Sequence, residues 1–172
     1  FVSTGIAFLN HVNLNSNLKL IYDASKNRID LKENELALNA LKLSLLGYIQ
    51  VKEEQSIEMD LKLNSPGTQF KDLFSLIPKA FIKNYQDVKS EGSFLINANI
   101  NGILNQNSNI YPSWDFVCRV TNGGIQYPNM PVKLSSFNLN MSSKNIGPDL
   151  SKLTVDLTPY SLLLNDKPVK GT

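Results

Sequence analysis

Cysteine and histidine are almost missing from this chain of 172 residues, which contains one of each. That scarcity excludes a disulfide framework and any zinc site built from Cys and His clusters. An excess of one charge is also missing. The 17 basic and 15 acidic residues leave a net charge of +2, so we expect no nucleic acid partner. No apolar run approaches the roughly 18 residues that a membrane-spanning helix needs.

Signatures of catalysis are also missing. No nucleophile elbow accompanies the lone His11, and Cys118 lies on the apolar side of a predicted strand, where cysteine usually acts as a small hydrophobic residue. Glu58 and Asp60 share one strand face about 7 Å apart, but Lys62 continues the same row, which is typical of a solvated sheet face. No phosphate loop or metal-ligand spacing is present. We expect neither enzymatic activity nor a cofactor.

Hydrophobic residues make up 42% of the chain and charged residues 19%, a balance typical of globular proteins. The strongest pattern is alternation of apolar and polar residues, which indicates strands with one dry face and one wet face. In Ile57–Asn64 the odd positions are apolar and the even positions polar. The same alternation predicts strands at 18–22, 29–31, 94–101, 114–121, 137–141 and 153–158.

The links between these segments are mostly short, which favours antiparallel neighbours. Turn-forming residues separate them at 25–27, 52–55, 105–109, 122–124 and 144–148. The leucine-rich run 36–45 changes phase, because Leu36 and Leu38 are even whereas Leu41 and Leu43 are odd. A strand cannot slip by one residue without inverting its faces. We therefore predict a β-bulge near Asn39-Ala40.

One stretch departs from the alternation. In Thr68–Pro78 the apolar residues fall at helical spacing. Thr68 is the expected cap, Asp72 lies in the first turn, and Pro78 ends the helix. A second short helical piece is expected from Lys79 to Asp87. The positions at helical spacing are Phe70, Leu73, Phe74 and Ile77.

These patterns predict a mainly β fold for the single segment 1–172. We expect a curved antiparallel sheet with a short helical insert near residues 68–87, arranged as an open groove, a half-barrel or a sandwich. A sheet with one apolar face must cover that face with a second sheet, a helix or a ligand. The same alternation fits the lining of a groove and an ordinary core. The candidate lining residues are Ile57, Met59, Leu61, Leu63, Phe94, Ile96, Ala98, Ile100, Trp114 and Phe116.

Two blocks of sequence resemble a known family. The first is Phe70–Pro78 followed by Val88–Phe94, and the second is Tyr111–Phe116 followed by Thr121–Pro131. They are similar to the "phenylalanine-lysine-aspartate-leucine, serine-leucine-x-proline" helix and the "asparagine-glycine-x-x-x-tyrosine-proline-x-x-proline" turn of the AsmA family of envelope proteins, in the form found in Bacteroidetes-type bacteria. The likeness covers about half of the chain, from Ile57 to Met141. Ser142–Asp149 departs from the family's Asn-Pro-Gly-Gly turn.

The resemblance implies a periplasmic segment of a protein anchored in the inner membrane. It also implies a link to outer-membrane assembly and phospholipid transport, through a long curved sheet with an apolar concave face. The partners implied are phospholipids or their acyl chains, envelope membranes reached through a segment outside this chain, and other segments of the parent chain. The chain begins with Phe1 and shows no signal core, so we expect an internal fragment.

The alternative is a structural or adhesive β-sandwich module of the cell envelope without a lipid ligand. In that arrangement the apolar faces of two sheets close on each other. The two hypotheses differ in one structural feature, which is whether the apolar face is sealed or open.

Overall fold

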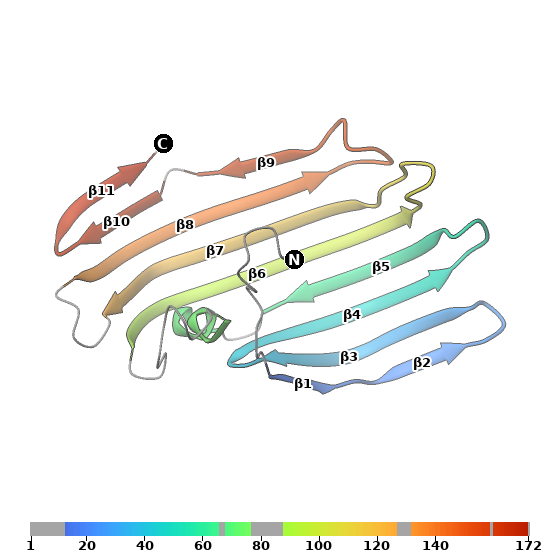
Figure 1. Ribbon diagram of the computed structural model, residues 1–172, viewed down its shortest axis with the longest axis horizontal. Coiled ribbons are helices and arrows are strands. Elements are labelled where there is room, and N and C mark those ends of the chain that lie inside the picture. Colours follow the sequence, from blue (N-terminus) through green and yellow to red (C-terminus); the bar gives the residue numbers. More distant parts are fainter. Residues whose placement is uncertain (1–12, 66–67, 77–87, 127–131, 159, 172) are drawn as a thin grey trace, which may run out of the picture.

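The computed structural model describes residues 13–65, 68–76, 88–126, 132–158 and 160–171. These residues form one antiparallel sheet of eleven strands and a single 3₁₀ helix, η1 (Figure 1). The mainly β prediction is therefore confirmed, and the described strands do not close into a barrel. The elements are β1 Leu14–Asn17, β2 Leu20–Asp23, β3 Arg28–Leu38, β4 Leu41–Val51, β5 Ile57–Asn64, η1 Phe70–Leu76, β6 Lys89–Leu104, β7 Ser113–Gln126, β8 Lys133–Asn145, β9 Thr154–Leu157, β10 Tyr160–Leu164 and β11 Lys167–Gly171.

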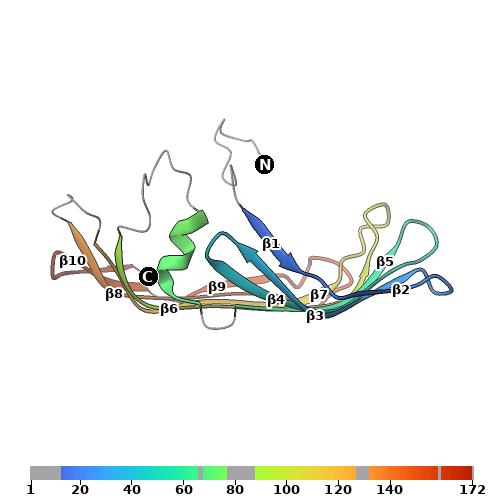
Figure 2. The same ribbon diagram turned by 90° about the horizontal axis from the view of Figure 1, so that it is seen from below.

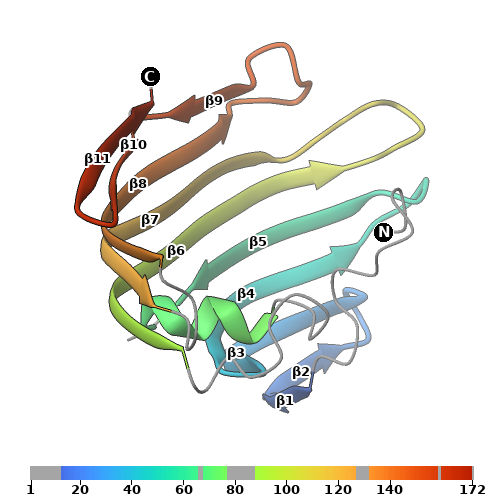
Figure 3. The same ribbon diagram turned by 60° about the vertical axis from the view of Figure 1, so that its left-hand side comes forward.

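The strands follow each other across the sheet in chain order, because short turns join neighbouring strands in space. The central order is β3-β4-β5-β6-β7-β8. On one side β1 and β2 both pair with β3, and on the other side β9 and β10 both pair with β8. Figure 3 shows β4 to β8 side by side as a single layer. The predicted antiparallel neighbours are confirmed by every strand pair described.

The sheet is curved along its strands. Seen edge-on in Figure 2, both strand ends rise on the side that holds η1, so η1 lies on the concave face. Glycines inside long strands favour this bending because they accept backbone angles that bend a strand. Gly47 of β4 and Gly102 of β6 have φ of 126° and 127°. A Cβ on Gly47 would lie 1.8 Å from the carbonyl oxygen of Asp60 on the next strand.

At the strand ends near η1, irregular pairing between strands adds to the curvature of the sheet. The register between β6 and β7 shifts between Glu91 and Ser93, and that between β7 and β8 shifts after Val120. The segment 122–124, predicted to separate two strands, lies instead inside β7 at these register shifts. Bulges bend a strand and increase its twist. The irregularities of β6, β7 and β8 therefore coincide, and they bend the three strands together.

The predicted bulge at Asn39-Ala40 is wrong. These two residues form the turn of a hairpin in which Leu38 of β3 pairs with Leu41 of β4. Asn39 has a φ of 55°, a left-handed conformation that asparagine tolerates and that tight hairpin turns require. Across a two-residue turn, the residues that face the same side change from even numbers in β3 to odd numbers in β4. This accounts for the change of phase in the sequence. The bulge of β3 lies instead between Leu31 and Asn34.

The predicted helix is present as a single 3₁₀ element, η1, and its predicted cap is wrong. The hydroxyl oxygen of Thr68 is buried without a hydrogen-bond partner. The carboxylate of Asp72 accepts a hydrogen bond from the backbone N–H of Gln69, at 2.9 Å, and satisfies the start of the element. The second predicted piece, 79–87, lies outside the described residues.

The closed core of the described chain is small and lies under η1. Its buried cluster consists of Leu41, Phe70, Phe94 and Val120. Phe70 of η1 also packs against Phe137 of β8, with ring centroids 6.0 Å apart. The core therefore forms where this short helix covers one end of the concave face.

The two edges of the sheet differ in character. At the β2 edge, Leu20, Ile21 and Tyr22 are 52%, 55% and 61% exposed. At the other edge β11 contains Lys167 and Pro168. Proline and lysine on an edge strand discourage pairing with a further strand. Of these two strands, only β11 carries this protection.

Candidate functional site

The concave face carries apolar side chains in rows that cross the sheet. Residues that pair directly across antiparallel strands point to the same side. One row pairs Leu61 of β5 with Ile100 of β6, and Ile100 with Trp114 of β7. Leu63, Ala98 and Phe116 form the next row. The register therefore places the predicted lining residues of three strands on one face.

Phe94, one of the predicted lining residues, shows which face this is, because it packs in the same buried cluster as Phe70 of η1. Since η1 lies on the concave side in Figure 2, the apolar rows line the concave face. All ten predicted residues share it. Together they form the floor of a shallow trough.

η1 divides the ten residues into two groups. Phe94 is buried in the cluster under η1, and Ile96 packs against that cluster; we call this region the covered end. Ala98, also buried, lies between the two groups. The remaining seven side chains are partly exposed, and none belongs to the core cluster or packs against it among the described residues. We call these seven the open floor: Ile57, Met59, Leu61, Leu63, Ile100, Trp114 and Phe116.

The apolar surface extends beyond the three strands singled out from the sequence. On β4, Leu45 pairs with Leu63 and Ile49 pairs with Met59. On β9, Val155 and Leu157 lie on the same face through Ser143 and Met141 of β8, and they are 64% and 58% exposed. The alternation of β4, β8 and β9 was visible in the sequence. The alignment of these strands with β5 required the register of the sheet.

Most polar side-chain atoms on this face form hydrogen bonds within the protein. Trp114 donates its indole N–H to the hydroxyl of Ser143, at 3.1 Å. Asn145 is 1% exposed and donates to the carbonyl of Pro112 at 3.0 Å, although its side-chain oxygen has no partner. Burial raises the pKa of the Cys118 thiol above its ordinary value of 9.0, so the thiol stays neutral at pH 7.

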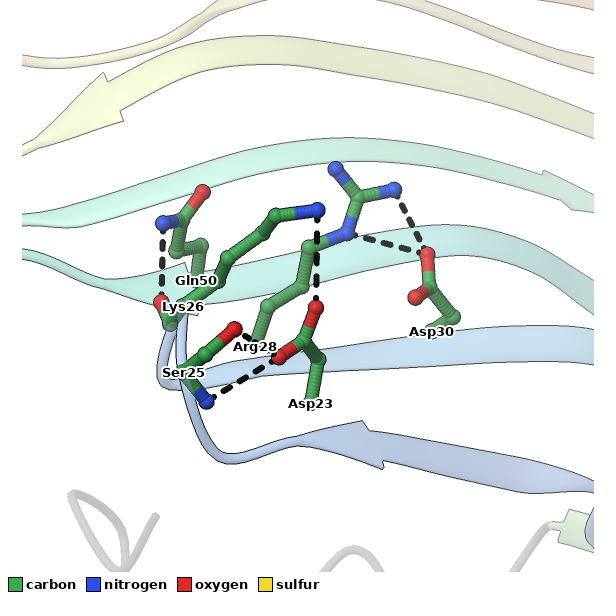
Figure 4. A network of polar contacts seen from close by, with 6 residues as sticks. All are labelled: Asp23, Ser25, Lys26, Arg28, Asp30 and Gln50. Atoms are coloured by element: carbon green, nitrogen blue, oxygen red, sulfur yellow. Dashed lines mark hydrogen bonds and ion pairs between the residues drawn. The ribbon is translucent and has the colours of Figure 1, made fainter.

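The convex face carries the charges instead. Arg28 makes an ion pair with Asp30 at 2.6 Å and lies over the ring of Tyr48, 3.7 Å from its centroid. Tyr48 donates to Glu58 at 2.9 Å, and Lys52 is also 2.9 Å from Glu58. Figure 4 shows how Arg28, Asp30 and the neighbouring turn residues lie together above β3 and β4.

These contacts shift the acidic groups in a consistent direction. The hydrogen bond from Arg28 lowers the pKa of Asp30, and the bonds from Lys52 and then Tyr48 lower that of Glu58. Asp30 and Glu58 therefore lie in ion-paired groups on the convex face.

A cleft of about 240 Å³ beside β1, β3 and β4 is lined by Asn15, Asn17, Glu35, Leu36, Ala37, Lys42 and Leu43. Among the described residues, no cluster of three or more His, Cys, Asp or Glu side chains could hold a metal ion. No described helix has the length and apolar character to cross a bilayer.

Comparison with known proteins identifies no relative of this chain. A scan against models of protein families finds no match. Searches among curated proteins and among solved structures also find none.

Proposed function

We propose that this chain is a non-enzymatic, lipid-binding segment of an AsmA-like envelope protein, located in the periplasm and supporting phospholipid transport to the outer membrane. Its concave face would hold acyl chains. The observation that carries the proposal is the open floor, a continuous apolar surface with partly exposed side chains. The family assignment rests on the sequence blocks 70–78, 88–94, 111–116 and 121–131.

The shape of the face favours hydrocarbon as its occupant. Large continuous apolar surfaces rarely remain exposed to water without a ligand or partner. Along β5 the open floor extends from Leu63 to Ile57, about 20 Å at roughly 3.3 Å per residue. Half of the hydrocarbon thickness of a bilayer is about 15 Å. An acyl chain therefore fits on the uncovered part of the trough without displacing η1.

The energetics suit a conduit. Each methylene group removed from water contributes about 0.8 kcal/mol, so a chain of sixteen carbons gains on the order of 12 kcal/mol. The bilayer interior offers a similar gain. Movement between the membrane and such a trough would then be nearly isoenergetic, which permits transfer in either direction without an energy-consuming step in this segment.

A matched pair of variants tests the proposal. Ile100→Asp places a charge on the open floor, and Asn99→Asp places the same charge on the convex face one residue earlier. We expect Ile100→Asp to weaken binding of a fluorescent fatty acid by at least tenfold, because a carboxylate in an apolar site is costly to desolvate. Asn99→Asp should bind like the parent chain. Circular dichroism of both variants shows whether the sheet is retained.

Mass spectrometry of gently purified protein provides an independent readout. We expect phospholipids or fatty acids to co-purify with the chain, and fewer of them with Ile100→Asp. Absence of lipid in the parent chain, together with no binding of the fluorescent fatty acid, would contradict lipid binding. It would favour a structural or adhesive module whose apolar face is covered by another part of the envelope.

A further inference from the structure

Charge is segregated strictly between the two faces around the open floor. The relevant region consists of β4, β5 and β7, with the parts of β6 and β8 at 94–104 and 137–145. Every charged side chain of this region alternates with concave residues and lies on the convex face. These residues are Lys42, Glu58, Asp60, Lys62, Asp115, Arg119 and Lys144.

The concave face of this region offers few free polar groups as well. Ser143 and Trp114 bond to each other, and Asn145 is almost completely buried. The thiol of Cys118 is neutral at pH 7 and a weak hydrogen-bond donor. Specific recognition of a headgroup requires charged or hydrogen-bonding partners placed at the site. The trough wall does not present them.

The loops beside the open floor carry no excess of one charge either, because the three lysines Lys26, Lys52 and Lys152 are matched by three acidic residues, Glu53, Glu54 and Asp149. The turns at 24–27, 52–56, 105–112 and 146–153 lie at the strand ends opposite η1; we call them the hairpin rim. Lys26 is 3.4 Å from Asp23, and Lys52 is 2.9 Å from Glu58. Cations already paired with carboxylates attract an external anion only weakly.

We infer that the trough recognises hydrocarbon alone and binds long-chain amphiphiles of any headgroup charge with similar affinity. This inference rests on the proposed function and specifies its ligand class. Affinity should follow the number of methylene groups, by about fourfold for each one. It should depend little on ionic strength, because the bound headgroup meets no unpaired charge on the wall.

The test is competition against a fluorescent fatty acid, with all amphiphiles below the concentrations at which they form micelles. Hexadecanoate, hexadecanol and hexadecyltrimethylammonium carry negative, neutral and positive headgroups on chains of equal length. We expect their affinities to agree within about fivefold, the size of an exposed charge interaction. Tetradecanoate, two methylenes shorter than hexadecanoate, should bind about 15-fold more weakly.

Two adjacent serines on opposite faces provide a control for the sensitivity of the assay. Ser143 pairs with Phe116 on the concave face, and Ser142 pairs with Val117 on the convex face. Ser143→Lys should make the chain prefer hexadecanoate over hexadecyltrimethylammonium by at least tenfold, because one ligand is attracted and the other repelled. Ser142→Lys should create no such preference.

The outcomes separate the inference from the function on which it rests. If the parent chain binds neither the fluorescent probe nor any competitor, the proposed function fails. If the parent chain binds but distinguishes the three headgroups by more than about fivefold, headgroup indifference is overturned while lipid binding stands. If Ser143→Lys folds and binds without discrimination, the headgroup does not pass near β8, and this description of the site is wrong.

Discussion

The covered end and the open floor are built from the same strands with the same alternation, yet one is closed and the other is not. In β6, Phe94 is 6% exposed beneath η1, whereas Ile100, six residues further along the same face, remains partly exposed. The difference comes from the seven residues of η1, which supply Phe70, Leu73 and Leu76 to the cluster. A one-layer sheet therefore obtains a core only where another element covers it.

The largest expected effect compares two phenylalanines. Phe94→Ala at the covered end should lower the free energy of unfolding by about 3–4 kcal/mol, because it leaves a cavity in a buried cluster. Phe116→Ala on the open floor should cost about 1–2 kcal/mol, since its ring already contacts water. Urea unfolding followed by circular dichroism measures both values. Equal costs would show that the open floor is covered in solution.

The second comparison concerns the two bending glycines on the concave face. Gly47→Ala should destabilise the chain by about 2–3 kcal/mol, because the new Cβ combines a strained φ with a clash against the backbone of Asp60. Gly102→Ala keeps the strained φ, but its Cβ would be 3.3 Å from the nearest atom, the Cα of Pro112. We expect about 1 kcal/mol there. The reverse order in urea unfolding would contradict this account.

Cys118 lies at the boundary of the two regions, because it packs against the covered cluster and pairs with Ile96. Its thiol should react slowly with a water-soluble thiol reagent, since burial raises its pKa and the thiolate is the reactive form. Saturating hexadecanoate should slow the reaction further, by several-fold. A Cys118→Ser, Asn99→Cys variant places the thiol on the convex face, where the ligand should have no effect.

The smallest effect should come from the convex face, where pH acts through Asp30 and Glu58. Both pKa values are lowered from ordinary values of 3.8 and 4.5 by their cationic partners. These groups therefore stabilise the fold above about pH 4.5, and that contribution disappears as pH falls through the lowered values. The change should be small because the pairs are solvated. Arg28→Met and Lys52→Met should weaken the acid-dependent part of a urea titration and leave pH 7 ligand binding unchanged.

Much of the strand layout was predictable because alternation has a direct physical cause. Ile57–Asn64 was predicted with its observed bounds, and the faces of 94–101 and 114–121 follow their predicted parity. The Asn39-Ala40 turn was missed because a bulge and a two-residue hairpin produce the same phase change. The left-handed preference of asparagine favoured the hairpin.

The common face of the ten candidates was predictable, but their division into a covered end and an open floor was not. All ten candidates lie on one face, as their alternation indicated. Alternation reports which residues avoid the wet side of a strand, and it carries no information about what lies above them. Phe94 and Phe116 have the same local pattern and different surroundings, because η1 reaches only one of them. That outcome depends on where a distant segment folds over the sheet.

The edge strands β2 and β11 are unequal as places where a further strand could pair. A further strand that pairs with β2 can bury the exposed apolar side chains of Leu20, Ile21 and Tyr22, and β2 contains no proline. In β11, Pro168 obstructs such pairing. When concentrated, isolated chains should therefore associate through β2 rather than through β11. Replacing Ile21 by lysine would keep such solutions clear for longer, as turbidity over time can record.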